Sequence, residues 1–388
     1  MSGDAPPASG QRVKLPGTEL LVSRVCLGTQ QFSGSTELGR HDVSWGAMSQ
    51  DTVDAIVVAA LDLGINFFDC AEAYGGGHAE VAFGAALRKC GRRNEAVIAS
   101  KFGKHKPLWE TDDPTGAQTV YDGDAVDKAL SQSMERLRVD CIDLYQIHWA
   151  GNIGIVGTVA DCKKAGTWDN VCSAVAALER AKQEGRIRYW GVCNFGTEDM
   201  ATLKAAGGGS AVSNQLPYSP VWRSIEHGVQ RGCGENQLAI LCYSPLMQGL
   251  LSGRVRSASD LPEGRRRTRV FASQSSPKSR HGGPGLEESL FAAGGALEEL
   301  SAISERHGIA LPVLSVAWLL SRDNVACVLV GASTPEQVAR NAELVQVNSA
   351  ALDDVTRATN GLLQRASEVY GSCVDQYAGV SRIHGNEC

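Results

Sequence analysis

Short runs of apolar residues recur along the chain and are separated by longer stretches with the periodicity of amphipathic helices. A continuous apolar run of this kind is typical of a parallel strand buried on both faces, where apolar and polar residues are not expected to alternate. The pattern predicts eight such strands, at residues 24–29, 65–70, 96–101, 141–148, 188–194, 211–215, 239–245 and 326–333.

Helical patterns occupy the intervals between these runs. The apolar residues of 124–139 fall near one face of a helix, and residues 171–186 form a second such helix with Gly185 as its stop. Eight alternations of strand and helix predict an α/β fold, a single (β/α)8 TIM barrel, in preference to a doubly wound open sheet. Long loops are then expected at the C-terminal face of that barrel.

Three stretches depart from this alternation. Residues 1–11 are rich in proline, glycine and serine and are predicted to be a flexible N-terminus. Residues 149–170 and 252–290 form long connections, and such loops are usually lids, binding loops or disordered inserts. We therefore assign the barrel to residues 12–348 and treat residues 349–388 as a C-terminal extension.

Composition narrows the class of protein. The 388 residues allow two or three domains at about 150 residues each, but one barrel can also take the whole length. A charged fraction of 21% and an apolar fraction of 43% exclude a fibrous or disordered chain. The net charge of −6 favours neither nucleic acid nor an anionic membrane as a partner. Since neither a spanning apolar run nor a secretory signal is present in the sequence, we expect a cytoplasmic protein.

Twelve cysteines are scattered along the chain without a C-x-x-C pair. Structural zinc sites use such pairs, so no metal site is expected. The thiols are expected to stay reduced and to pack as small apolar side chains.

Polar side chains stand at the C-terminal ends of nearly all the predicted strands, where barrel enzymes carry their chemistry. The second strand leads to Asp69 and then Tyr74, the third ends in Lys101 and the fourth in His148. Each has a structural alternative: a cap, a turn aromatic, a surface lysine and a structural histidine. Their convergence argues against all four alternatives at once. The later strands end in Asn194, Asn214, Gln215, Tyr243, Ser244 and Ser333.

These four residue types suit proton transfer to an oxygen atom. A tyrosine has a pKa near 10, too high for efficient proton transfer at neutral pH without help. An ammonium such as Lys101 would lower that pKa, and Asp69 would keep the lysine charged and fixed. His148 would orient a carbonyl or share the proton. No activated nucleophile accompanies the set, so hydrolysis is poorly supported and a cofactor must supply any hydride.

The same residues lie in segments that together resemble the aldo-keto reductase superfamily over residues 12 to 348. The matching segments are VSRVCLGTQQF, INFFDCAEAYGGGHAE, VIASKFG, SMERLRVDCIDLYQIH, EGRIRYWGVCNF, SNQLPYSPVWR, YSPLMQGLLSGR and VLVGASTPEQVARN. The short connections and the GASTPEQ segment most resemble the branch that contains aryl-alcohol dehydrogenases and potassium-channel β subunits.

The resemblance implies a catalytic tetrad and an extended nicotinamide cofactor, usually NADPH, without a Rossmann fingerprint. The implied tetrad is Asp69, Tyr74, Lys101 and His148, with Tyr74 as the general acid in carbonyl reduction. Asn194 and Gln215 would hold the carboxamide, and Tyr243 would stack on the nicotinamide. The implied pyrophosphate contacts are Ser244, Leu246, Gly249, Leu250, Ser252 and Arg254. Ser333, Gln337 and Asn341 would lie at the adenosine end, and Gly28 and Thr29 complete the implied cofactor site.

Three features depart from the family pattern. Cys193 stands where a serine is usual, which weakens one expected hydrogen bond to the carboxamide. Arg340 stands where a glutamate often faces the adenine. The long connections named above leave the substrate pocket undefined by analogy. Cations that could favour a 2′-phosphate are Arg340 and the arginines at 265–267 and 269, although such a run is also typical of a solvated loop.

The sequence therefore predicts an NADPH-dependent oxidoreductase that acts on a small-molecule aldehyde or ketone. The alternative is a regulatory module that binds the cofactor, as in potassium-channel β subunits, and the tetrad alone does not separate the two. Neither the physiological substrate nor the oligomeric state follows from the sequence. Cys70 and Cys193, both predicted at the catalytic face, add the hypothesis that oxidation inactivates the site.

Overall fold

A computed structural model gives the fold. It describes residues 11–34, 48–103, 120–266, 268–272, 284–343, 347–371 and 376. Residues 1–10 of the predicted flexible N-terminus, Arg267, part of the 252–290 connection and most of the tail beyond 371 lie outside the described residues.

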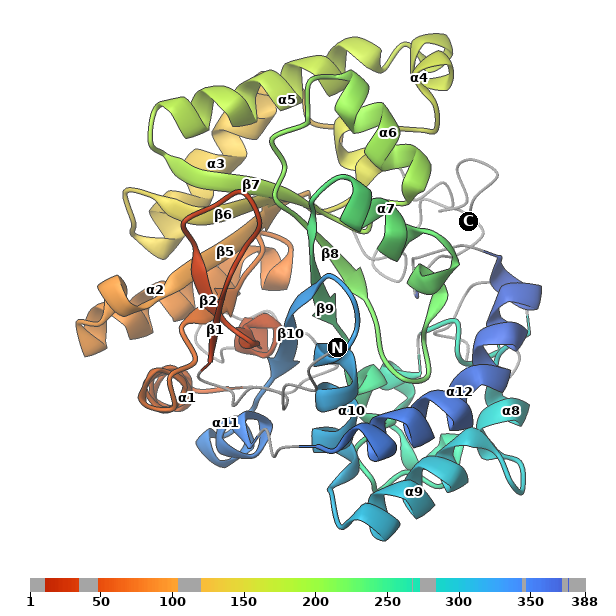
Figure 1. Ribbon diagram of the computed structural model, residues 1–388. Helices are drawn as coiled ribbons and strands as arrows, with labels where there is room; N and C mark the ends of the chain where they lie inside the picture. The colour runs from red at the N-terminus through yellow and green to blue at the C-terminus, as the bar shows by residue number, and fades with distance from the viewer. Residues whose placement is uncertain are drawn as a thin grey trace.

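Eight parallel strands form a closed barrel, as the apolar runs predict (Figure 1). Each strand hydrogen-bonds to the next in chain order, and the last pairs with the first. Buried side chains on both faces explain why these strands read as continuous apolar runs. The strands are β3 (Val25–Gly28), β4 (Phe67–Asp69), β5 (Val97–Phe102), β6 (Ile142–Ile147), β7 (Ile187–Cys193), β8 (Ser213–Pro217), β9 (Ala239–Tyr243) and β10 (Val325–Gly331).

Helices surround the barrel (Figure 1). The two helices predicted in detail are confirmed, as α3 and α5, and the stop at Gly185 is confirmed by its positive φ of 73°. The helices are α1 (Gln50–Asp62), α2 (His78–Cys90), α3 (Gly123–Leu137), α4 (Val159–Ala165), α5 (Trp168–Gln183), α6 (Thr197–Ala205), α7 (Val229–Glu235), α8 (Glu287–Phe291), α9 (Ala296–His307), α10 (Leu311–Leu320), α11 (Pro335–Ala342) and α12 (Ser349–Tyr370).

A short antiparallel hairpin precedes the barrel and was not predicted. It consists of β1 (Arg12–Lys14) and β2 (Leu21–Ser23). The buried side chains of Leu15, Leu20 and Val22 belong to the same apolar cluster as the residues that fill the barrel interior. The hairpin therefore closes one end of the barrel.

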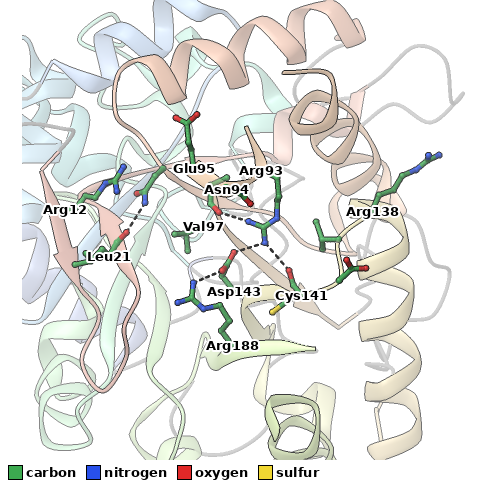
Figure 2. Close-up of a pocket in the computed structure, with 14 residues that line it drawn as sticks. Arg12, Leu21, Arg93, Asn94, Glu95, Val97, Arg138, Cys141, Asp143 and Arg188 are labelled. Carbon is green, nitrogen blue, oxygen red and sulfur yellow. Dashed lines mark hydrogen bonds and ion pairs between the residues drawn. The ribbon is translucent and has the colours of Figure 1, made fainter. Parts of the chain in front are cut away.

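A depression of about 690 Å³ lies at the N-terminal ends of the strands (Figure 2). Its centre is Asp143, whose buried carboxylate accepts hydrogen bonds from Arg93 at 3.1 Å, Arg188 at 3.0 Å and the backbone N–H of Ile98 at 2.9 Å. Asp143 is on β6, Arg188 on β7 and Ile98 on β5, and Arg93 lies in the 3-10 turn (Arg93–Glu95) before β5, so Asp143 ties neighbouring strands together. In barrels of this type this face serves stability, and chemistry belongs to the opposite face.

The predicted long connections have more regular structure than their composition suggested. Residues 149–170 contain a 3-10 turn (Ala150–Ile153), the helix α4 and the start of α5. In the described part of 252–290 the chain forms two 3-10 turns (Ala258–Asp260 and Glu263–Arg265) and begins α8.

The region beyond residue 348 begins with the long helix α12, which packs against α9 and α10 (Figure 1). Arg223 fixes it: this buried guanidinium forms a bidentate ion pair with Glu226 and donates to Thr359 and Asn360 at 3.0 Å. Among the described helices, none is both long enough and apolar enough to cross a membrane.

Candidate active site

Four residues of the predicted tetrad lie at the C-terminal ends of three adjacent strands. Asp69 is the last residue of β4, and Lys101 is the fifth of the six residues of β5. His148 directly follows β6, and Tyr74 begins a 3-10 turn (Tyr74–Gly77) after β4. Parallel pairing of β4, β5 and β6 brings these ends to the same rim of the barrel.

Lys101 is the centre of the site. Its side chain is fully buried, and its ammonium lies 2.6 Å from Oδ2 of Asp69. The same nitrogen donates to the hydroxyl oxygen of Tyr74 and to the backbone carbonyl of Cys70, both at 3.0 Å. The Tyr74 hydroxyl also lies 3.4 Å from Asp69 Oδ2, so three of the four residues form one hydrogen-bonded group.

The pKa of Tyr74 shifts in the opposite direction to the one predicted. Burial raises the pKa of Tyr74, and although Lys101 lowers it as expected, burial has the larger effect. For Lys101, burial is the largest single influence and lowers the pKa, but Asp69, Tyr74 and Cys193 together outweigh it, and the pKa is raised. The expectation of a net lowered tyrosine pKa is therefore wrong. The site holds a neutral phenol beside a charged ammonium.

His148 faces the phenol from the neighbouring strand. Its ring centroid lies 6.2 Å from that of Tyr74, and the two rings are nearly perpendicular, at 85°. On its other side the imidazole is stacked on Trp149 at 6.1 Å. At this rim Tyr74, His148 and Trp149 together present a phenol hydroxyl and three aromatic rings in contact.

The three residues predicted around the nicotinamide also meet at this rim. Tyr243 donates to the side-chain oxygen of Asn194 at 2.8 Å, and Asn194 donates to the backbone carbonyl of His148 at 3.1 Å. Gln215 donates to Oδ1 of Asp69 at 2.8 Å. The carboxylate of Asp69 thus holds both the lysine and this amide in place.

Two cysteines lie inside this group, and both are buried. Asn194 donates to Sγ of Cys193 at 3.2 Å. Sγ of Cys70 lies 3.0 Å from the hydroxyl of Thr29, and burial raises the pKa of this thiol. A raised pKa disfavours the reactive thiolate, which argues against Cys70 as an oxidation target.

The remaining predicted cofactor residues lie on the connections after β3, β9 and β10. Thr29 donates to the backbone carbonyl of Asp69 at 2.9 Å, and Gly28 pairs in register with Asp69 and with Gly331. The segment with Leu246, Gly249, Leu250, Ser252 and Arg254 follows β9, and Arg254 is exposed.

Two of the residues predicted for the adenosine end, Gln337 and Asn341, lie on α11, and Ser333 lies just before its N-cap. Ser333 donates its backbone N–H to Gln337 at 2.7 Å, and Asn341 donates to the carbonyl of Gly331 at 3.2 Å. Arg340 is exposed on the same helix. Arg269, in contrast, is buried with its guanidinium 4.3 Å from the ring centroid of Tyr370.

Sequence reasoning missed three contributors to this region. Gln376 in the tail donates to Ser244 Oγ at 2.8 Å, Trp149 stacks on His148, and Glu72 is buried close to Tyr74 in the chain. A signal existed for Glu72, because it is a charged residue inside the apolar DCAEAY segment. Among the described residues no group of three or more histidine, cysteine or acidic side chains could hold a metal ion.

Comparison with known proteins identifies the family. Residues 24–358 match the aldo/keto reductase family, and the chain therefore belongs to this family of NAD(P)-dependent oxidoreductases. The NADP(+) aldo-keto reductase yakc of Schizosaccharomyces pombe is 29% identical over 349 residues, which cover 88% of this chain and 91% of the relative. The NADH-specific methylglyoxal reductase of Escherichia coli is 26% identical over 346 residues, or 87% and 94% of the two chains.

The fold comparison agrees with this assignment. The structure of a glycerol dehydrogenase from Gluconobacter oxydans superimposes with a TM-score of 0.67 at 26% identity, covering 92% of this chain and 96% of that one. The resemblance stated from the sequence motifs is confirmed at the level of the family and the barrel fold.

Proposed function

We propose that the protein reduces the carbonyl group of a small aldehyde or ketone to the alcohol, with Tyr74 as the general acid and NADPH as the cofactor. The observation that carries this proposal is the group of Lys101, Tyr74 and Asp69, joined by contacts of 2.6 Å and 3.0 Å. Such a group delivers a proton to an oxygen atom and has no nucleophile for acyl or phosphoryl transfer.

Each residue has a separate part in the proton transfer. The phenol of Tyr74 gives its proton to the carbonyl oxygen, and the ammonium of Lys101 stabilises the phenolate that remains. Asp69 keeps Lys101 charged and fixed in a buried position. His148 lies at the edge of the phenol, where it can donate a hydrogen bond to the carbonyl and orient it. Bound NADPH supplies the hydride that the carbonyl carbon receives.

The residues present fit a nicotinamide ring. Asn194 and Gln215 offer amide donors and acceptors that match a carboxamide, and the ring of Tyr243 offers a flat face. The bond from Tyr243 to Asn194 holds these two side chains in one fixed arrangement. Gln215 lies next to the tetrad because its side-chain amide donates a hydrogen bond to Asp69. A nicotinamide held there would be adjacent to the carbonyl that Tyr74 protonates.

The preference for NADPH over NADH rests on charge near the adenosine end. Arg340 is exposed on α11, the helix that also carries Gln337 and Asn341 of the predicted adenosine end, and an arginine suits a 2′-phosphate. The two relatives named above differ in their cofactor, so the family alone does not decide this point. Within the family we place the chain in the branch of aryl-alcohol dehydrogenases and potassium-channel β subunits, on the motifs quoted above.

A panel of carbonyl compounds tests the proposal. Purified protein is mixed with NADPH or NADH and with aromatic, aliphatic and sugar aldehydes, ketones and quinones, and the loss of reduced cofactor is followed. We expect turnover of at least one class, with a higher kcat/KM for NADPH than for NADH. Tight binding of NADPH without turnover of any compound would contradict the reductase proposal and favour the regulatory module.

A further inference from the structure

Glu72 is a buried carboxylate two residues before Tyr74. Its exposed fraction is 2%, and its backbone N–H donates to the carbonyl of Lys101 at 3.1 Å. Among the described residues its Oε2 atom has no hydrogen-bond partner. A buried carboxylate without a cation is costly, so its presence beside the tetrad points to a role beyond packing.

Glu80 shows what a structural carboxylate looks like in this same region. It is fully buried, but Arg136 donates to it at 2.6 Å and Ser100 donates to it at 2.5 Å. Both of its oxygens are therefore satisfied, one of them by a cation. Both carboxylates are buried, but among the described residues Glu80 has a cationic partner and Glu72 has one oxygen without a hydrogen bond.

The Oε1 atom of Glu72 accepts two hydrogen bonds, from the backbone N–H of Gly103 and from the hydroxyl of Tyr121, both at 2.8 Å. Gly103 directly follows β5, and Tyr121 directly precedes the cap of α3. The side chain of Glu72 thus links the segment of Tyr74 to the end of β5 and to the residue before the N-cap of α3.

The same two partners contact the segment that carries His148. Tyr121 donates its backbone N–H to the carbonyl of Asn152 at 2.7 Å, and Asn152 donates to the carbonyl of Trp149 at 2.9 Å. Gly103 has a φ of +127°, and a Cβ at that position would lie 3.0 Å from Cβ of His148 and 2.2 Å from Oδ1 of Asn152. Glycine is required at this position, because the two segments touch through it.

We propose that Glu72 is a positioning residue that fixes the Tyr74 segment relative to the His148 segment, through Gly103 and Tyr121. It thereby sets the distance between the proton donor and the group that orients the carbonyl. This inference rests on the proposed function of the tetrad. A displacement of about 1 Å in such a site can lower a rate about 100-fold. Loss of the hydrogen bonds from Gly103 and Tyr121 to Glu72 should therefore lower kcat more than it weakens cofactor binding.

Three variants test the proposal. Glu72→Ala removes the acceptor, Glu72→Gln keeps an acceptor oxygen without the charge, and Glu80→Gln is the matched control for altering a buried carboxylate. We expect Glu72→Ala to lower kcat about 10- to 100-fold with an unchanged Kd for NADPH. Glu72→Gln should recover most of that loss, and Glu80→Gln should lower Tm while kcat stays near the wild-type value. A wild-type kcat in Glu72→Ala, or an equal loss in Glu80→Gln, would overturn the proposal.

Hydrogen exchange gives a readout that does not depend on activity. In Glu72→Ala we expect faster exchange of the backbone amides in residues 70–77 and 148–152, and no such change in Glu80→Gln. If wild-type protein reduces no carbonyl compound, the proposed function fails, but the exchange data still decide whether Glu72 joins the two segments.

If Glu72→Ala does not fold, Tyr121→Phe removes one of the two hydrogen bonds to Glu72 and keeps the ring. Unchanged kcat and exchange in that variant would also overturn the proposal.

Discussion

The ammonium of Lys101 donates to the hydroxyl oxygen of Tyr74 at 3.0 Å. A lysine ammonium has no acceptor, so the proton of the phenol is not used in this bond; the phenol donates instead to Oδ2 of Asp69 at 3.4 Å, a long contact that a carbonyl oxygen can replace. The pair is held in a buried position by Asp69, which is 2.6 Å from the same ammonium. Lys101 thereby offsets part of the destabilisation of the Tyr74 phenolate that burial causes.

The pH dependence of the two reaction directions follows from the pKa of Tyr74. Because burial raises this pKa above its usual value, the phenol stays protonated at neutral and mildly alkaline pH. Reduction needs the protonated form, so we expect kcat for reduction to show no alkaline loss up to about pH 9. Oxidation of the alcohol needs the phenolate and should rise with pH over the same range. A fall in reduction kcat with an apparent pKa near 7 would contradict this assignment.

Replacement of Lys101 by methionine removes the cation and keeps a side chain of similar length. We expect kcat to fall about 100-fold or more, because the phenolate loses its stabilising charge. We also expect the free energy of unfolding to fall by about 3–5 kcal/mol, since Asp69 is left buried without its partner. Steady-state kinetics and urea denaturation measure the two effects. Lys89→Met, which alters a surface ion pair, is the control and should change neither.

A substitution at Asp143 tests whether the face of the barrel at the N-terminal strand ends contributes to stability alone and not to catalysis. Asp143→Ala leaves Arg93, Arg188 and the N–H of Ile98 without their shared acceptor. We expect a loss of about 1–3 kcal/mol in the free energy of unfolding, because a buried acceptor of three hydrogen bonds is lost while both arginines keep partial contact with solvent. At a temperature where the variant is folded, kcat should equal that of the wild type. A large loss of kcat in the folded variant would show that this face is coupled to the chemistry.

Helix α12 is predicted to be an integral part of the folded protein, although we assigned residues 349–388 to an extension. Val355, Leu362 and Tyr370 are buried in the apolar core that α12 shares with the outside of the barrel. Leu362→Ala should lower the free energy of unfolding by about 2–5 kcal/mol without changing kcat. Removal of residues 349–388 should abolish cooperative unfolding, as measured by calorimetry. A truncated chain with the wild-type Tm would show that the helix is dispensable.

The barrel strands were predictable because their signal is local. Parallel strands buried on both faces appear as continuous apolar runs, and Asp69 and Lys101 were found because they lie at the ends of two of these runs. The hairpin of β1 and β2 was missed since its strands have three residues each, too few to show a period. Helix α4 was missed although its signal is present: Thr158 and Asp161 form a capping box at its start.

Other features depend on contacts that sequence spacing does not contain. The net direction of the Tyr74 pKa shift depends on how much solvent the fold removes, which no motif specifies. The contact of Gln376 with Ser244 joins positions far apart in the chain. Helix α12 has an interior glycine, Gly361, which weakens its helical signal, and its stability comes from packing on α9 and α10.

The most direct test of the account is the turnover of Tyr74→Phe. This variant keeps the ring and removes only the hydroxyl that Lys101 contacts at 3.0 Å. With the best carbonyl substrate and saturating NADPH, we predict that kcat falls by a factor of about 100 to 10,000 while the Kd for NADPH remains that of the wild type. Turnover at the wild-type rate in this variant would contradict the assignment of Tyr74 as the proton donor.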